Sequence, residues 1–247
     1  MSLGLFMVSA CFFGTLFEHP GSPFRQAVAD PFLRRIPMGL AMGLTAAGLI
    51  YSPWGRRSGA HMNPSVTLTF LRLGKLEPWD ALFYVLAQFL GGVAGVVVSS
   101  AVLQGRLAHP NVNFVATLPG PRGVWLAFVA EAIIAFVLMS VVLRASNARR
   151  LTRWTGLFAG TLVATYIMLE APFSGMSMNP ARTLGSAFSA HLWTALWIYF
   201  LAPPLGMLLA AELYVRQKGI HKVFCAKLNH VAGQRCIFRC NYSQLGV

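Results

Sequence analysis

Two Asn-Pro pairs are the residues of this chain whose types and spacing point most clearly to a function. They lie in two similar decapeptides, from Ser58 to Thr67 and from Ser174 to Thr183, in which Ser, Gly, Met, Asn, Pro and Thr recur at one constant offset. Asn is among the best helix N-caps, and Pro fits the first helical turn, where no N–H is needed. Each pair therefore predicts the start of a helix, and the chemistry offered there is hydrogen bonding by a side-chain amide.

A second candidate group lies near the carboxyl terminus. Cys225, His230, Cys236 and Cys240 follow the spacing Cys-x4-His-x5-Cys-x3-Cys, with His221 just before them. Thiolate and imidazole groups are zinc ligands, but this spacing matches no regular zinc finger. The interpretation preferred from sequence is a flexible tail with reduced, unliganded cysteines, so no metal and no cofactor are predicted. Cys11, in an apolar segment, is predicted to be a core residue.

The composition predicts the elements that must position these groups. Of the 247 residues, 56% are hydrophobic and 11% are charged, and about 25% would be charged in a typical soluble domain. Apolar runs of about 18 residues predict membrane-spanning helices, whereas a soluble all-α domain would need polar helix faces that these runs lack. Six stretches meet or approach this length: residues 3–17, 36–54, 79–103, 124–143, 154–173 and 193–215.

The placement of the positive charge predicts the orientation in the membrane. The net charge is +13, and fourteen of the twenty Lys and Arg residues follow the second, fourth and sixth stretches. The positive-inside rule places these three regions in the cytoplasm. Because six spans are an even number, both termini are then cytoplasmic. This distribution argues against nucleic acid as a partner. No cleavable signal peptide is predicted.

The repeat divides the chain into two similar halves. Residues 1–215 form the predicted membrane domain, with halves of about 1–105 and 122–215, and residues 216–247 form a basic cytoplasmic tail containing Cys and His. Each half reads span, span, Asn-Pro segment, span. Three spans per half predict that the halves insert in opposite orientations, which places a binding or conducting site near the membrane midplane.

The Asn-Pro helices are too short to cross the membrane. The first runs from Asn63 to Leu73, about 16 Å at 1.5 Å per residue, whereas the hydrocarbon core is roughly 30 Å thick. The second is expected to end near Phe188. The two helices are therefore predicted to enter from opposite sides with their amino ends meeting halfway, in protein or beside a water-filled cavity. A pair of surface loops with Asn-Pro caps is the alternative.

The two halves differ at their first span. Glu131 opens the fourth span, and in the register of the repeat its counterpart would fall immediately before Met1. Two interpretations are open. Either the natural start lies upstream, or the first helix is short and lacks a buried carboxylate.

These residues resemble those of the aquaporin, or major intrinsic protein, family from about Leu3 to Val215. The similarity rests on the two Asn-Pro boxes, the second followed by Arg182, on the span of Glu131, and on matching motifs in the third and sixth spans. The resemblance implies an all-α membrane protein with six transmembrane helices and two re-entrant half-helices. It further implies one pore per subunit, a homotetramer in the plasma membrane, and passive flow of water and small uncharged solutes without ions or protons.

The resemblance also assigns the residues of the pore. The two boxes are Asn63, Pro64 and Ser65, where the family usually has Ala as the third residue, and Asn179, Pro180 and Ala181. The selectivity filter maps onto Met42, Ile167, Met176 and Arg182. Strict water channels usually have an aromatic residue and a histidine at the first two filter positions. The two asparagines are expected to donate hydrogen bonds to the permeating oxygen, or alternatively only to cap their helices.

Roles are also expected for three other polar residues. Arg182 is expected to supply a fixed positive charge in the pore, or alternatively to pair with a carboxylate such as Glu170. Glu131 is expected to anchor backbone N–H groups of the half-helix. His61 is expected to form structural hydrogen bonds, with pH gating as the alternative.

Two other functions remain as alternatives at this point. One is a channel of the same family that prefers glycerol, urea or metalloid hydroxides, as Ser65 and Ile167 suggest. Another is a secondary transporter, since inverted repeats with broken helices also build those; its only candidate coupling carboxylates are Glu131 and Glu170. An enzyme is not predicted, because the spans contain no nucleophile–base set.

Overall fold

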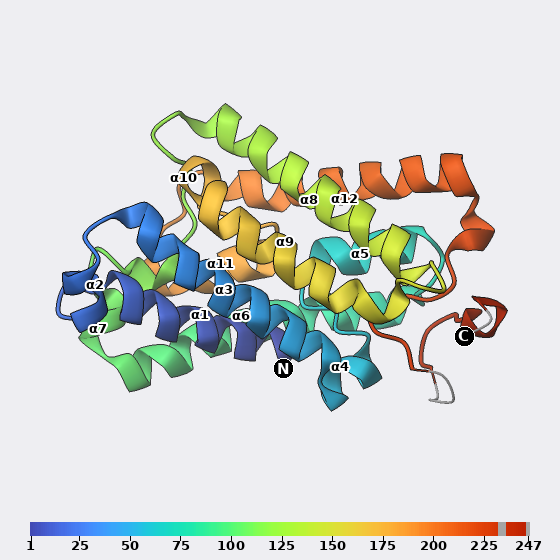
Figure 1. The fold of residues 1–247 in the computed structure, drawn as a ribbon, viewed down its shortest axis with the longest axis horizontal. Coiled ribbons are helices and arrows are strands. Elements are labelled where there is room, and N and C mark those ends of the chain that lie inside the picture. Colours follow the sequence, from blue (N-terminus) through green and yellow to red (C-terminus); the bar gives the residue numbers. More distant parts are fainter. Residues whose placement is uncertain (232–235, 246–247) are drawn as a thin grey trace.

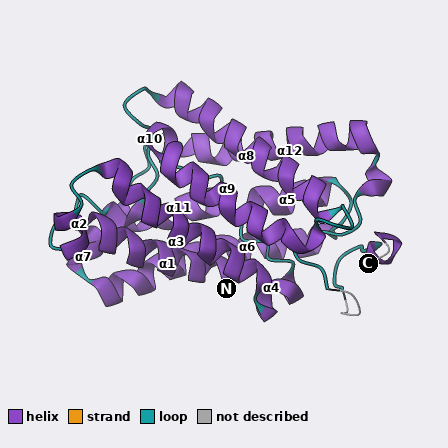
Figure 2. Ribbon diagram, viewed as in Figure 1, coloured by secondary structure: helices purple, strands orange, loops and turns teal. Residues whose placement is uncertain are grey.

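The computed structural model describes residues 1–231 and 236–245, and every regular element within these residues is helical (Figure 2). Six long helices form the body of the protein (Figure 1): α1 Ser2–Glu18, α3 Pro31–Tyr51, α6 Pro78–Leu103, α8 Val124–Ser146, α9 Thr155–Leu169 and α12 Leu196–Lys218. Two short helices, α5 Pro64–Arg72 and α11 Pro180–Ala190, follow the Asn-Pro pairs and are called the half-helices below. The predicted helical architecture is confirmed.

Short helical segments connect these elements. They are α2 Pro23–Ala27, α4 Pro53–Ser58, α7 Gly105–Ala108, α10 Ala171–Ser174 and the 3-10 turns η1 Asn113–Val115, η2 Thr152–Trp154, η3 Ile220–Lys222 and η4 Tyr242–Leu245. The second predicted span ends earlier than expected, because the Ser52 side chain accepts a hydrogen bond from the Gly55 N–H and starts α4. The fifth ends at Leu169, but Glu170 keeps helical dihedral angles and leads directly into α10.

Three of the long helices are recognisable as membrane spans from their own sequence. Among the described residues, α6, α8 and α12 are long and apolar enough to cross a membrane, and α1 is a shorter apolar helix. The other two spans depart from this pattern, since α3 carries Arg34 and Arg35 in its first turns and α9 has 15 residues. The position of α3 and α9 is set by their packing against each other and against the other helices.

The helix contacts follow the predicted two-fold repeat. In the first half α1 packs against α3 and α6, and in the second half α8 packs against α9 and α12. The halves join where α3 packs against α9. Each half-helix contacts the last span of both halves, because α5 lies against α6 and α12 while α11 lies against α12 and α6. Neither half-helix is therefore buried by its own half alone.

The two halves are in close backbone contact at a pair of glycines. A Cβ atom added to Gly43 of α3 would lie 2.5 Å from the carbonyl oxygen of Gly160 in α9, and one added to Gly160 would lie 2.5 Å from that of Gly43. Small residues allow such backbone contact between membrane helices. These two glycines occupy matching positions of the repeat, so the contact lies at its pseudo-symmetry axis.

The tail folds back onto the helices. Val223, Cys225, Ala226 and Leu228 belong to the same buried cluster as Met139 of α8. Figure 1 shows the tail at the end of the molecule toward which α3, α8 and α12 run. The expectation of a flexible tail is wrong for these residues, because their apolar side chains have a buried surface to pack against.

We predict that Gly43→Leu prevents close packing of α3 and α9, whereas Gly48→Leu is tolerated. Gly48 lies on the same helix, and an added Cβ there would meet no heavy atom within 4 Å. Overpacking a tight site costs about 1–3 kcal/mol, so Gly43→Leu should lower the thermal midpoint in detergent and the monodisperse fraction. Equal behaviour of the two variants would show that the glycine contact does not set the packing.

Candidate functional site

The amino ends of the two half-helices meet inside the protein, and each is capped by its asparagine. Asn63 Oδ1 accepts a hydrogen bond from the Ser65 N–H at 2.8 Å. Asn179 Oδ1 accepts bonds from the N–H groups of Ala181 at 3.0 Å and Arg182 at 3.2 Å. Pro64 and Pro180 occupy the first helical position, where their missing N–H leaves no group unpaired. The predicted capping by both asparagines is confirmed.

The same asparagines cross-link the two halves of the chain. Asn63 Nδ2 donates to the carbonyl oxygen of Met178 at 2.6 Å, and Asn179 Nδ2 donates to that of Met62 at 2.8 Å. Each acceptor is the residue just before the other asparagine. Since an amide NH2 group carries two hydrogens, each Nδ2 keeps one N–H for another acceptor. Each Oδ1 is engaged by N–H groups of its own helix, and the unused N–H of each Nδ2 is a donor that the amide can offer to another molecule.

A buried carboxylate holds the loop that leads into α11. Glu131 of α8 is fully buried. Its Oε1 accepts from the Ser174 hydroxyl and the Ser177 N–H, both at 2.7 Å, and its Oε2 accepts from the Met178 N–H at 2.7 Å. These bonds turn the Met178 carbonyl toward Asn63. Glu131 thus anchors backbone N–H groups as predicted, but these belong to the loop before α11 and not to the half-helix itself.

The loop before α5 is held by different residues. Gln88 Nε2 donates to the His61 carbonyl at 2.8 Å and to the Thr67 hydroxyl at 3.0 Å. His61 Nε2 lies 2.8 Å from the Ala226 carbonyl, which can only accept, so Nε2 carries the proton and Nδ1 accepts from the Thr67 hydroxyl at 3.3 Å. The predicted structural role of His61 is confirmed, and its partner lies in the tail.

An elongated cavity of about 290 Å³ passes this meeting point. On α3 its lining residues recur every three or four positions, at Arg35, Met38, Met42, Ala46 and Ile50. This spacing follows one face of the helix over about 22 Å, at 1.5 Å per residue. Because α3 supplies lining from its first turns to its last, the cavity follows the long direction of the bundle.

Six of the ten residues predicted to form the site line this cavity. They are Asn63, Asn179, Met42, Ile167, Met176 and Arg182. The other four do not line it. Pro64, Ser65, Pro180 and Ala181 are buried in the first turns of the half-helices, where they position the asparagines.

Arg182 adds a positive charge to the cavity wall. Its Nη1 donates to the Ser186 hydroxyl at 3.3 Å. The ion pairs in the part of the chain that the structure describes are Arg34–Glu18, Arg72–Glu212 and Arg239–Glu77. The alternative pairing of Arg182 with Glu170 is therefore absent from the described residues.

Among the lining residues that sequence reasoning missed, two show what could and could not have been predicted. Met38 lies one turn before Met42 on α3, so helical periodicity would have identified it. Leu228, from the tail, also lines the cavity. No sequence signal marks Leu228, because its position depends on how the tail folds back.

Comparison with known proteins identifies the family. The sequence matches the major intrinsic protein family over residues 8–214. The chain belongs to this family. It is 40% identical over 185 residues to aquaporin NIP2-1 of Zea mays, covering 74% of this chain and 60% of that protein. It is 38% identical over 162 residues to aquaporin NIP6-1 of Arabidopsis thaliana, covering 65% of this chain and 51% of that protein.

A solved structure supports the fold independently. The chain superimposes on the aquaglyceroporin from Plasmodium falciparum with a TM-score of 0.68, covering 86% of this chain and 92% of that one, at 20% sequence identity. This similarity shows a common fold. The chain spans 60% or less of the two plant relatives described above, and it is a multi-pass membrane protein of the major intrinsic protein family.

We predict that Glu131→Gln lowers water flux several-fold at equal membrane abundance, because the amide NH2 would face N–H donors that now bind a carboxylate. The matched control is Glu170→Gln. The Glu170 carboxylate is also buried, and neither oxygen has a hydrogen-bond partner among the described residues. Neutralising it should leave flux near that of the parent. Stopped-flow measurements on proteoliposomes compare the two variants, and equal losses would contradict the anchoring role.

Proposed function

We propose that this protein is a passive transmembrane channel for water and small uncharged solutes that excludes ions and protons. The observation that carries the proposal is the pair of amide donors where two helix amino ends meet, on the wall of an elongated cavity. The wall is otherwise mainly apolar. A neutral molecule with an acceptor oxygen can therefore pass while finding its hydrogen bonds at one central position.

The donors impose an orientation on the permeating molecule. A water that accepts from both Asn63 and Asn179 must point its own hydrogens away from them, toward the two ends of the pore. Such a water cannot donate to its neighbours in one continuous direction, so a proton wire is interrupted. Both half-helices add to this effect, since each places roughly half a positive charge at its amino end. Arg182 repels cations at a second position on the same wall.

The filter residues suggest which solutes pass. Met42, Ile167 and Met176 are apolar and line the cavity together with Arg182. These three apolar side chains beside the fixed donor Arg182 suit a solute with carbon or other weakly hydrated surface beside its hydroxyl or amide groups. This composition also favours the second candidate, a channel that prefers glycerol, urea or metalloid hydroxides over water.

The remaining features of the proposal concern assembly and location. We place the protein in the plasma membrane as a homotetramer, with lipid on its outer surface, where Trp79, Leu90 and Val102 of α6 are exposed. The carboxyl ends of α3, α8 and α12 face the cytoplasm, because basic residues lie at or directly after them, and both termini lie on the same side. We propose no catalytic activity. Nucleic acid is not a partner.

We predict that purified protein in proteoliposomes gives osmotic water flux with a low activation energy and no accompanying current. Flux follows from light scattering in a sucrose gradient, and current from a pH-sensitive dye under an imposed potential. Proton current comparable to water flux, or flux that requires an ion gradient, would contradict the channel and favour a transporter. Repeating the assay with glycerol and urea decides between the two candidate solute preferences.

We predict that Ile167→His lowers flux of the larger neutral solutes more than water flux. The imidazole adds a polar group to the wall and narrows the cavity. A narrower cavity hinders the passage of glycerol more than that of water, because glycerol is larger. Ile167→Val, which keeps the wall apolar, is the matched control and should favour larger solutes slightly. If Ile167→His scales both fluxes equally, Ile167 does not lie at the constriction.

A further inference from the structure

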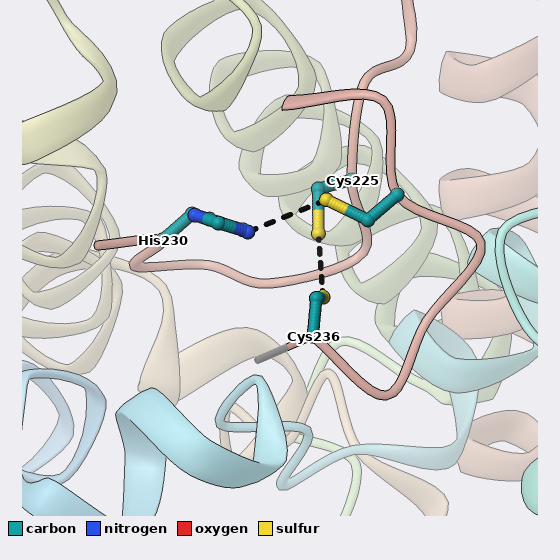
Figure 3. A group of neighbouring side chains, drawn as sticks. Cys225, His230 and Cys236 are labelled. Carbon is teal, nitrogen blue, oxygen red and sulfur yellow. Dashed lines mark hydrogen bonds between the residues drawn. The ribbon is translucent and has the colours of Figure 1, made fainter. Parts of the chain in front are cut away.

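The tail brings together four metal-binding side chains that the pore does not use. The ligand atoms of Cys225, His230, Cys236 and Cys240 all lie within 4.8 Å of one another. Cys225 Sγ lies 3.5 Å from Cys236 Sγ, and Cys240 Sγ lies 3.3 Å from His230 Nε2. Figure 3 shows Cys225, His230 and Cys236 pointing toward one another from separate parts of the tail.

These distances suit a tetrahedral zinc site. With Zn–S bonds of about 2.3 Å and Zn–N bonds of about 2.0 Å, ligand atoms of a tetrahedron lie roughly 3.5–3.8 Å apart. The pairs at 3.3 and 3.5 Å are close to this separation. Three thiolates and one imidazole are soft and borderline ligands, which select zinc among the common divalent cations. The four residues fill a closed structural site and leave no open position.

A disulfide is the competing explanation for paired cysteines. All four cysteines of the chain are free in the structure. The 3.5 Å between Cys225 Sγ and Cys236 Sγ exceeds the S–S bond length of about 2.05 Å. A disulfide here would also not explain why Cys240 and His230 lie beside this pair, whereas a metal ion would be bound by all four side chains.

The segment that carries the ligands has little structure of its own to hold it. Apart from the 3-10 turns η3 and η4, its described residues form loops. It is tied to the helices at scattered points: Asn147 Oδ1 accepts from the Phe224 N–H at 2.7 Å, and the Lys75 carbonyl accepts from the Arg239 N–H at 3.1 Å. Small loop-rich segments commonly need a metal or disulfide to stay folded. A bound ion would supply that cross-link.

The loop between the first two ligands reaches the pore. The Leu228 N–H donates to the Gly59 carbonyl at 3.2 Å, and the Ala226 carbonyl bonds His61. Both partners lie just before the first Asn-Pro pair. Leu228 lines the same cavity as Asn63 and as Ile50, which lies at the carboxyl end of α3. A metal ion that closes the loop from Cys225 to His230 therefore also fixes Leu228.

We propose that Cys225, His230, Cys236 and Cys240 bind one zinc ion, and that this ion holds Leu228 in the wall of the cavity. The metal site stands on the geometry of the tail. The effect on the pore rests on the channel function proposed above. This proposal replaces the sequence-based interpretation of reduced, unliganded cysteines. The spacing of the four ligands matches no regular motif, and only the fold shows that they lie together.

The metal site is tested by elemental analysis of the full chain, purified with a non-metal-binding tag under reducing conditions and incubated with zinc. About one zinc per chain is expected after gel filtration. Cys236→Ser and His230→Ala should lower zinc content at least about tenfold. His230→Cys should retain it, since four thiolates also bind zinc. Cys11→Ala is the matched control, because Cys11 is buried in α1 outside the cluster.

Three results would overturn the site. They are a metal-free protein after zinc loading, equal zinc content in the parent and in His230→Ala, and a Cys225–Cys236 disulfide in protein alkylated at lysis. Cys236→Ser could lose zinc merely because it misfolds. The comparison between His230→Cys and His230→Ala then remains decisive, because His230→Cys is expected to fold and to bind zinc. None of these measurements involves flux, so they do not depend on the channel function.

The effect on the pore is tested by reconstituting zinc-loaded and chelator-stripped protein in parallel. Stripped protein should conduct water at least about twofold faster, and zinc-loaded Leu228→Ala should match it. Stripping Leu228→Ala should then add little. Equal flux in all four samples would refute the effect of Leu228 while the zinc content still decides the site. Absence of flux in every sample would instead refute the proposed channel.

Discussion

The amino ends of two helices are buried against each other in the middle of this protein, and the rest of the structure depends on satisfying them. Each helix start leaves about four N–H groups without an intrahelical partner, and such groups are costly in an apolar environment. Proline removes one donor at each end, and the asparagine side chains accept from others. The asparagines then become donors themselves, and each finds a carbonyl in the opposite loop. The remaining donor capacity faces the cavity, where a polar permeant can accept it.

The loops that lead into α5 and α11 are held by different residues, although the two half-helices begin in the same way. In the second half a carboxylate, Glu131, accepts from three donors. In the first half Gln88 donates to the loop carbonyl of His61. A separate cavity of about 290 Å³ is lined by Met1, His61 and Gln88. The loop of the first half is also the one that the tail contacts, through His61 and Gly59.

Most of the fold was predictable from sequence, because the repeat and the apolar stretches carry strong signals. The Asn-Pro pairs fixed the start of both half-helices to the residue, and six of the ten predicted site residues line one cavity. The ends of helices were less predictable: Ser52 starts α4 through a local hydrogen bond that the apolar pattern around Trp54 conceals. The tail was the least predictable part. Its ligands come together only because Cys225 and Leu228 pack onto helices that lie far away in the sequence, and no local pattern encodes that.

The exchange of contacts between the halves has a consequence for how the protein is made. Asn63 bonds to Met178, which follows it by 115 residues, and α5 is covered by α12 from the end of the membrane domain. At about 5–20 residues per second, a ribosome needs roughly 6–23 seconds to synthesise that interval. During this time the Asn63 amide lacks its acceptor, the Met178 carbonyl, and α5 lacks its contact with α12. The first three helices must therefore wait in the membrane as an incomplete intermediate, and the second half, as it inserts in the opposite orientation, completes both halves at once.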